Sequence, residues 1–181
     1  MEEQYRGIVS NIRKLGWLQW KKMFFLMLLL VITVIAISSS LPMNENQSSD
    51  ILRDFENNLP EIDTQPILAN NFFIASIMMI PIFGLAIGVM VLQTTGIFIA
   101  ATGISVDIPG IFLLLSLLVF PFTWLEFISY AAAMTQSVFL ILGLSRKNLK
   151  KELMRTIFLL ITIFIMLLIA AFIETILIYL V

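Results

Sequence analysis

The charged residues of this chain are confined to a few short stretches, and the segments between them are long and apolar. All but one of the 11 basic residues lie in residues 1–22 or in the loop 145–155, whereas the charged residues of 41–69 are six acids and one Arg. Because 60% of the 181 residues are hydrophobic and only 13% are charged, one soluble core could not bury the apolar surface. We therefore predict an all-α, polytopic transmembrane helical bundle in contact with the lipid bilayer.

The distribution of the basic residues predicts the orientation. Loops rich in Lys and Arg stay in the cytoplasm, so the N-terminus and the loop 145–155 are expected there, with the acidic loop 41–69 on the opposite side. An odd number of crossings then makes the C-terminus extracytoplasmic. We expect a multi-pass protein of the cell membrane. Because this topology explains the basic stretches, they indicate no nucleic-acid partner.

About five spans satisfy this orientation and the length of about 20 residues that a membrane helix needs. The segment 23–40 is the first span, and residues 70–181 hold a four-span core. The third span, 93–121, is predicted to be discontinuous, and both crossing and re-entry remain open for it. It contains two apolar pieces separated by Gly103, Asp107, Pro109 and Gly110. The other core spans are predicted at Asn70–Leu92, Phe122–Leu144 and Thr156–Leu180, with a kink at Pro81 and a turn at Pro121.

The N-terminal region admits alternatives. Its basic residues, its apolar run and Ala36-Ile37-Ser38 vaguely resemble a secretory signal peptide, but the polar stretch 1–22 is long for one, which favours an uncleaved anchor. That stretch is either an amphipathic helix at the cytoplasmic interface or a helical extension of the first span. Trp17 and Trp20 are interpreted as an interfacial aromatic belt.

The acidic loop 41–69 is too short for an independent domain. Asp50 is predicted to cap a short helix that carries Phe55 on its apolar side and ends at Pro60. We expect this helix to cover the outer mouth of the bundle or to meet a partner. The triplet Asn46-Gln47-Ser48 matches a glycosylation sequon, a pattern that is frequent by chance.

Small residues four positions apart predict close helix packing. Gly84 and Gly88 form a G-x-x-x-G pattern, and Ser129, Ala133 and Ser137 form a second stripe. Such stripes let two helix backbones approach closely. They could pack within one chain or between copies, and the second possibility, with the acidic loop, motivates the expectation of a homo-oligomer.

Asp107, Glu126 and Glu174 fall inside predicted spans, yet no Lys, Arg or His lies between residues 70 and 145 or after residue 155. Ionised groups are expensive in a bilayer. These carboxyl groups must therefore be protonated, bonded to polar neighbours, exposed to water or neutralised by a cation.

Glu126 and Glu174 are expected at similar depths, about 6 Å and about 9 Å from the outer ends of their spans. We predict an intramembrane polar cluster of Glu126, Glu174 and Asn71, with Asp107 as a further candidate. Asp107 precedes Pro109, which favours a helix-capping role for it. The cluster could lock helices together, bind a proton or cation, or contact a partner.

The absence of His and Cys excludes several enzyme classes. Intramembrane zinc proteases need His ligands, and rhomboid-type proteases need a Ser–His dyad. An aspartyl protease needs two Asp residues, and only Asp107 is predicted inside the membrane. We therefore expect no enzyme activity, no metal and no cofactor.

Several residues, in chain order, carry a family resemblance. Asn70-Asn71 opens an apolar segment with Gly84 and Gly88, and the later elements are Thr95-Gly96, Trp124-Leu125-Glu126, Ser129-Tyr130-Ala131-Ala132 and Ala170-Ala171-Phe172-Ile173-Glu174. Over roughly residues 68–181 this order resembles the stage II sporulation protein M family. Phe122-Thr123 stands where that family has His-Gly, and Thr95 where it has Asn, so a role of the family's His does not carry over.

The resemblance implies a multi-span protein without known catalytic activity. In endospore formers the named member is a membrane scaffold that works with cell-wall hydrolases, but this short chain is more similar to members from organisms that make no spores. The leading hypothesis is a membrane scaffold that recruits membrane or envelope proteins as a homo-oligomer. The alternative is a transporter or channel component for protons, cations or small solutes that uses Glu126 and Glu174.

Overall fold

The computed structural model describes the backbone of residues 2–58, 63–145 and 149–180, and the side chains of residues 18–55, 63–144 and 149–180. The secondary structure of these residues is entirely helical and consists of seven helices. Four are long and apolar enough to cross a membrane, which confirms the predicted all-α bundle with several apolar spans. They are α1 (Glu2–Ser39), α4 (Gly84–Ser105), α6 (Pro121–Ser145) and α7 (Leu149–Leu180).

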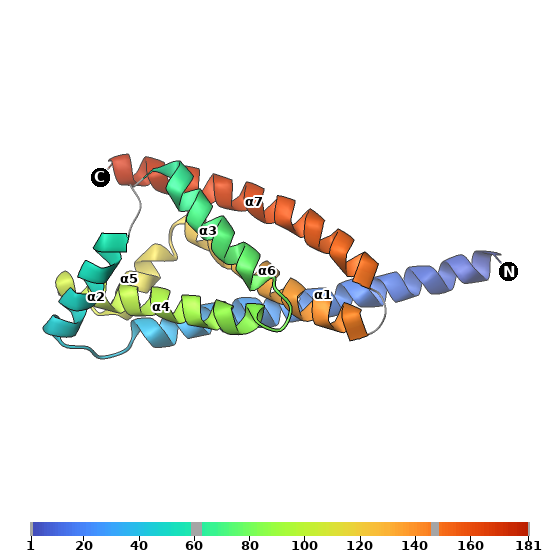
Figure 1. Ribbon diagram of the computed structural model, residues 1–181, viewed down its shortest axis with the longest axis horizontal. Helices are drawn as coiled ribbons and strands as arrows, with labels where there is room; N and C mark the ends of the chain where they lie inside the picture. Colours follow the sequence, from blue (N-terminus) through green and yellow to red (C-terminus); the bar gives the residue numbers. More distant parts are fainter. Residues whose placement is uncertain (1, 59–62, 146–148, 181) are drawn as a thin grey trace.

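The four long helices run along the long axis of the molecule (Figure 1). α6 packs against both α1 and α7, and α1 also packs against α4. α6 is the most buried of the four, whereas α7 turns most of its apolar surface outward. Because helices satisfy their own backbone hydrogen bonds, such a surface suits direct contact with lipid.

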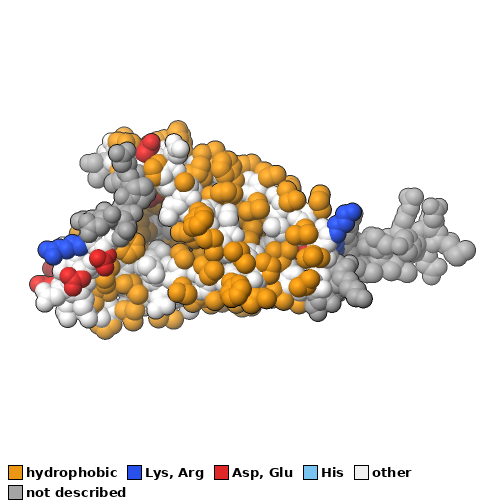
Figure 2. Space-filling view, viewed as in Figure 1, with side chains coloured by type: hydrophobic (Ala, Val, Ile, Leu, Met, Phe, Trp, Pro, Cys, Tyr) orange, Lys and Arg blue, Asp and Glu red, His pale blue; other side chains and the backbone are white. Residues whose placement is uncertain are grey.

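The charged side chains lie at the two ends of the molecule, and apolar side chains cover the middle of the face shown in Figure 2. The basic end holds Lys150 and Lys151 at the start of α7, together with Lys21 and Lys22 of α1. The opposite end, called the α2 end, holds α2 (Glu45–Asn58) and the last residues of α1, α4 and α7. This separation is typical of a protein whose middle lies in the hydrocarbon core of a bilayer.

α1 is one unbroken helix, so residues 2–22 continue the first span. This matches the predicted helical extension and not a separate helix lying at the interface. The interfacial role predicted for Trp20 is wrong, because Trp20 is buried and its Nε1 donates a hydrogen bond to Gln136 Oε1 at 3.4 Å. The Trp17 side chain lies outside the described residues.

α2 begins earlier than predicted, because Asn44 and not Asp50 provides its N-terminal cap. Asn44 Oδ1 accepts from the Gln47 backbone N–H at 2.9 Å, and Gln47 Oε1 accepts from the Asn44 N–H at 3.1 Å. This reciprocal pair is a capping box. The predicted end of α2 at Pro60 lies outside the described residues.

α2 packs along α4 and covers the end of the bundle, as one of the two predictions for this segment required. Ser48 is buried, and its hydroxyl donates to the Ala101 carbonyl at 2.8 Å. Farther along α2, the rings of Phe55 and Phe98 of α4 make a second contact, with centroids 4.4 Å apart. The hydroxyl of the sequon Asn46-Gln47-Ser48 therefore faces α4.

The single span predicted at Asn70–Leu92 is wrong. The structure has two helices there, α3 (Thr64–Met78) and α4, joined by a turn that contains Pro81. Both helices extend from this turn toward the α2 end, so together they form a hairpin (Figure 1). Pro81 therefore lies in a chain reversal and not in a kink.

The turn of this hairpin is held against α6. Ser137 Oγ donates to the Ile80 carbonyl at 2.8 Å. Ser137 lies 16 residues after Pro121, about 24 Å along α6, so the turn lies roughly two-thirds of the way along that helix. Ile82 in the turn has φ 74°, a conformation that β-branched residues rarely adopt.

The interruption predicted within residues 93–121 is present, but it follows a complete helix. α4 continues to Ser105, residues 106–109 are not helical, and the short α5 (Gly110–Leu117) follows. The capping role predicted for Asp107 is wrong. The N-cap position of α5 is Pro109, which makes no side-chain capping bond, and Asp107 has φ 57° and is exposed.

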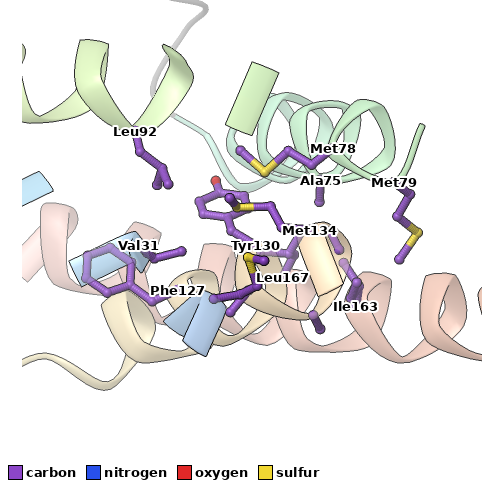
Figure 3. Close-up of a cluster of buried hydrophobic side chains, with 14 of the residues drawn as sticks. Val31, Ala75, Met78, Met79, Leu92, Phe127, Tyr130, Met134, Ile163 and Leu167 are labelled. Atoms are coloured by element: carbon purple, nitrogen blue, oxygen red, sulfur yellow. The ribbon is translucent and has the colours of Figure 1, made fainter. Parts of the chain in front are cut away.

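The apolar core lies where α1, α3, α4 and α7 meet α6 (Figure 3). Met134 of α6 is fully buried, and an added Cβ on Gly88 would lie only 2.9 Å from its sulfur. α1 and α4 approach equally closely at Gly96, where a Cβ would lie 2.5 Å from Cβ of Ser38. The glycines of α4 thus set the spacing of three helices.

Candidate functional site

The structure brings Asn71 and Glu126 together from two different helices. Asn71 Nδ2 on α3 donates a hydrogen bond to Glu126 Oε1 on α6 at 2.6 Å. Both side chains are partly buried. Glu126 lies five residues after the start of α6 at Pro121, roughly 8 Å from that end. Its hydrogen-bond donor from α3 is therefore a neutral amide and not a cation.

Glu174 of α7 lies close enough to Glu126 for the two carboxyl groups to interact electrostatically. It is six residues from Leu180 at the end of α7, roughly 9 Å along the helix. Tyr130, one turn after Glu126, is buried within electrostatic range of both carboxyl groups. Glu126, Glu174, Asn71 and Tyr130 are called the carboxyl cluster below.

Several contacts fix α3 in the position that presents Asn71. The Thr64 hydroxyl donates to Thr175 Oγ1 of α7 at 2.9 Å. Farther along, the rings of Phe72 and Phe164 meet edge to face with centroids 5.3 Å apart. These contacts join α3 to α7 on both sides of Asn71.

Asp107 is not part of the carboxyl cluster. It lies in the exposed connection between α4 and α5. Within the residues whose side chains are described, no group of three or more Asp and Glu residues is arranged to hold a metal ion.

An open groove adjoins the carboxyl cluster at the α2 end. It has a volume of about 440 Å³ and lies between α5, the start of α6 and the last turns of α7. Its lining is apolar except for Glu174. Glu174 therefore borders both the interior of the bundle and the groove, whereas Asn71 engages Glu126.

The two predicted stripes of small residues pack against each other within one chain. A Cβ on Gly84 would lie 2.8 Å from Ser137 Oγ, and one on Gly88 would touch Met134, both on α6. Ser129, Ala133 and Ser137 are all buried. The small residues of both stripes are thus occupied by packing within one chain, and they no longer motivate a homo-oligomer.

Gln136 is a polar centre that the sequence prediction did not include among the sites. It is fully buried, and its Nε2 donates to the Glu152 carbonyl at 3.1 Å and to Thr156 Oγ1 at 3.0 Å. Its Oε1 accepts from Trp20. The sequence feature that could have identified this site is a single amide side chain within an apolar span, because such a group needs hydrogen-bond partners in the bilayer. Its contacts join α1, α6 and α7 near the basic end.

The carboxyl cluster has the chemistry of a proton or cation site. Two carboxyl groups in a dry environment do not both stay ionised without a compensating positive charge. The sequence supplies no Lys, Arg or His between residues 70 and 145 or after residue 155. A proton or a bound cation can provide that charge.

No protein-family model, no curated protein and no solved structure matches the chain.

Proposed function

We propose that this chain is a non-enzymatic integral protein of the cell membrane whose carboxyl cluster takes up a proton or a small cation during transport. The proposed topology has a cytoplasmic N-terminus and an extracytoplasmic C-terminus. In it α1, α6 and α7 cross the membrane, and the α3–α4 hairpin enters from the side of the α2 end and returns to it. Resemblance to the stage II sporulation protein M family is retained as part of this proposal, because Glu126 and Glu174 are its best-matched elements.

One observation carries the proposal. Glu126 and Glu174 come from different helices and lie within electrostatic range of each other inside the bundle, and no Lys, Arg or His lies between residues 70 and 145 or after residue 155. A carboxyl that only joins helices needs a donor, and Asn71 serves Glu126 in this way. A second carboxyl beside it adds repulsion, which a proton or a cation removes.

A membrane scaffold remains the second candidate, on the basis of α2. This helix is anchored to α4 through Ser48, and it presents Glu45, Asp50 and Asp54 outward at the end of the molecule. A folded, charged surface outside the membrane suits recruitment of another protein. The carboxyl cluster would then stabilise the bundle only.

Ion flux in proteoliposomes tests the leading proposal. The parent protein is expected to carry a proton or alkali-cation flux under an imposed gradient, read with a pH-sensitive dye or an ion-selective electrode. Glu126→Gln and Glu174→Gln are expected to reduce this flux toward that of empty liposomes, because an amide cannot take up the proton or neutralise the cation.

Glu45→Gln is the matched control, because Glu45 is an exposed acid on α2 outside the spans. It is expected to keep the parent flux. Absence of flux from the parent at any pH, for protons and for alkali cations alike, would refute the transport proposal and leave the scaffold as the better explanation.

A further inference from the structure

The groove beside the carboxyl cluster has the size and lining of a site for an organic ligand. Its volume of about 440 Å³ falls within the range of roughly 300–1,000 Å³ that small-molecule sites occupy. The residues that line it are Leu117, Phe120, Phe122, Glu174, Leu177 and Ile178. They come from the end of α5 and the start of α6, which are neighbours in the sequence, and from the distant last turns of α7.

The groove combines a large apolar surface with one acidic group. Among the described residues that line it, Glu174 is the only ionisable one, and the rings of Phe120 and Phe122 stack with centroids 5.6 Å apart on one side. A carboxylate and aromatic faces both attract an ammonium group. The apolar remainder suits a hydrocarbon body attached to that group.

We propose that this groove binds a lipophilic amine, a compound with one ammonium group on an apolar chain or ring system, and that the ammonium group lies at Glu174. This inference rests on the proposed transport function, because it uses Glu174 of the same cluster. It adds the class of cation, namely an organic amine that reaches the groove from the lipid.

The charges in the groove favour a simple amine over a membrane phospholipid. An ethanolamine lipid carries an ammonium group, but its phosphate would lie nearby. The groove offers that phosphate no Lys or Arg, and Glu174 would repel it. A molecule with a single positive charge and no anion is therefore the better electrostatic match.

Glu126 is close to Glu174, so a ligand bound at Glu174 changes the electrostatic repulsion between the two carboxyl groups. The two carboxyl groups repel each other when both are ionised, and an ammonium ion at Glu174 compensates that repulsion. The amide of Asn71 already serves Glu126. The cluster is thus divided between one carboxyl held inside the bundle and one that borders the groove.

This proposal is tested by asking whether an amine protects an introduced cysteine from labelling by a maleimide. The chain has no native cysteine, so only the introduced thiol is labelled. Ile178→Cys places a thiol in the groove, and Ile176→Cys places one on the same helix outside the groove lining, at similar exposure (41% and 43%). Each variant, in nanodiscs of pure phosphatidylcholine, is treated with N-ethylmaleimide in the presence of dodecylamine or dodecanol. The labelling rates are then compared.

Dodecylamine is expected to slow labelling at position 178 severalfold and to leave position 176 unchanged. Dodecanol at the same concentration is expected to protect neither. Adding Glu174→Gln is expected to weaken protection at position 178 by roughly tenfold or more, as expected for loss of an ionic hydrogen bond. Unchanged labelling at position 176 in that variant shows that the helix is still folded.

Three outcomes would overturn the proposal. Equal protection by dodecanol would show that the groove selects only for apolar chains. Undiminished protection in the Glu174→Gln variant would place the amine elsewhere. Protection by phosphatidylethanolamine in the nanodisc, without added amine, would identify a phospholipid as the occupant. Proton or alkali-cation flux measured separately in proteoliposomes would survive any of these results, so failure of the amine proposal can be distinguished from failure of the transport proposal.

Discussion

Asn70 and Asn71 are neighbours in the sequence but differ in what they contact. Asn71 donates to Glu126 inside the bundle, whereas Asn70 is exposed. Asn71→Leu is expected to lower the free energy of unfolding by about 1–3 kcal/mol, because it leaves the Glu126 carboxyl without that donor. Asn70→Leu is the matched control and should leave stability nearly unchanged.

Unfolding in mixed micelles with increasing sodium dodecyl sulfate, followed by tryptophan fluorescence, measures this difference. Equal midpoints for the two variants would show that the bond between Asn71 and Glu126 contributes nothing measurable to the fold.

Gln136 joins α1, α6 and α7 near the basic end of the bundle. Gln136→Leu removes the acceptor of the Trp20 indole and the donor to the Glu152 carbonyl and Thr156. We expect a loss of about 1–3 kcal/mol, because the three hydrogen bonds of this buried amide are lost when an apolar side chain replaces it. The control Gln93→Leu changes an exposed glutamine on α4 and is expected to be neutral. The same unfolding measurement in sodium dodecyl sulfate tests this prediction. A Gln136 variant as stable as the Gln93 variant would show that the hydrogen bonds of Gln136 do not stabilise the bundle.

At the scale of elements, α2 illustrates how a polar helix attaches to an apolar bundle. Its acidic face is turned away from α4, and the buried Ser48 hydroxyl and the Phe55 ring provide contacts with α4. Only the contacting face needs complementarity, so the rest of the helix can vary with little effect on packing.

Ser48→Ala is expected to destabilise the docked position of α2 by about 1 kcal/mol, because the Ala101 carbonyl loses its donor. Amide hydrogen exchange across residues 45–55 should accelerate accordingly, by roughly fivefold at that free energy. Ser49→Ala, at an exposed position next to it, is the control and should exchange like the parent. Identical exchange in both variants would mean that other contacts hold α2.

At the same scale, the hairpin of α3 and α4 shows what a turn requires inside an apolar bundle. Its connection exposes backbone carbonyls, and Ser137 of α6 donates to one of them at Ile80. Non-helical backbone at membrane depth is tolerated where protein groups satisfy it. The same serine is close to Gly84, so one small residue of α6 serves both the turn and the helix that follows.

At the scale of the whole molecule, the charges at the two ends determine how it can lie in a bilayer. The positive-inside rule predicts that the basic end faces the cytoplasm and the α2 end faces outward. Lys151→Cys is therefore expected to react with an impermeant maleimide only after permeabilisation of cells. Ser49→Cys is expected to react in intact cells.

Both positions are exposed in the structure, so access to the reagent and not burial determines the result. Ser48 is unsuitable for this purpose because it is buried. The reverse labelling pattern would invert the proposed topology and place the carboxyl cluster near the cytoplasmic side of the membrane.

Some features follow from local pattern, and others do not. The helices α6 and α7 lie close to their predicted positions, because a long apolar run between charged stretches has few alternatives to a spanning helix. The hairpin was missed because Pro81 has the same local signal whether it kinks a helix or reverses the chain. The cap at Asn44 was missed for a similar reason, since Asn44 and Asp50 are both capping residue types.

The sequence by itself determined that the chain is helical and apolar, that its charges are segregated, and that acidic residues lie in spans without nearby cations. Each of these properties depends only on residue type and order. The tertiary structure decided which groups meet: Asn71 with Glu126, Ser137 with the α3–α4 turn, and Glu174 with the groove. Those contacts depend on the orientation of each helix about its axis and relative to its neighbours, which is set by packing between residues tens of positions apart.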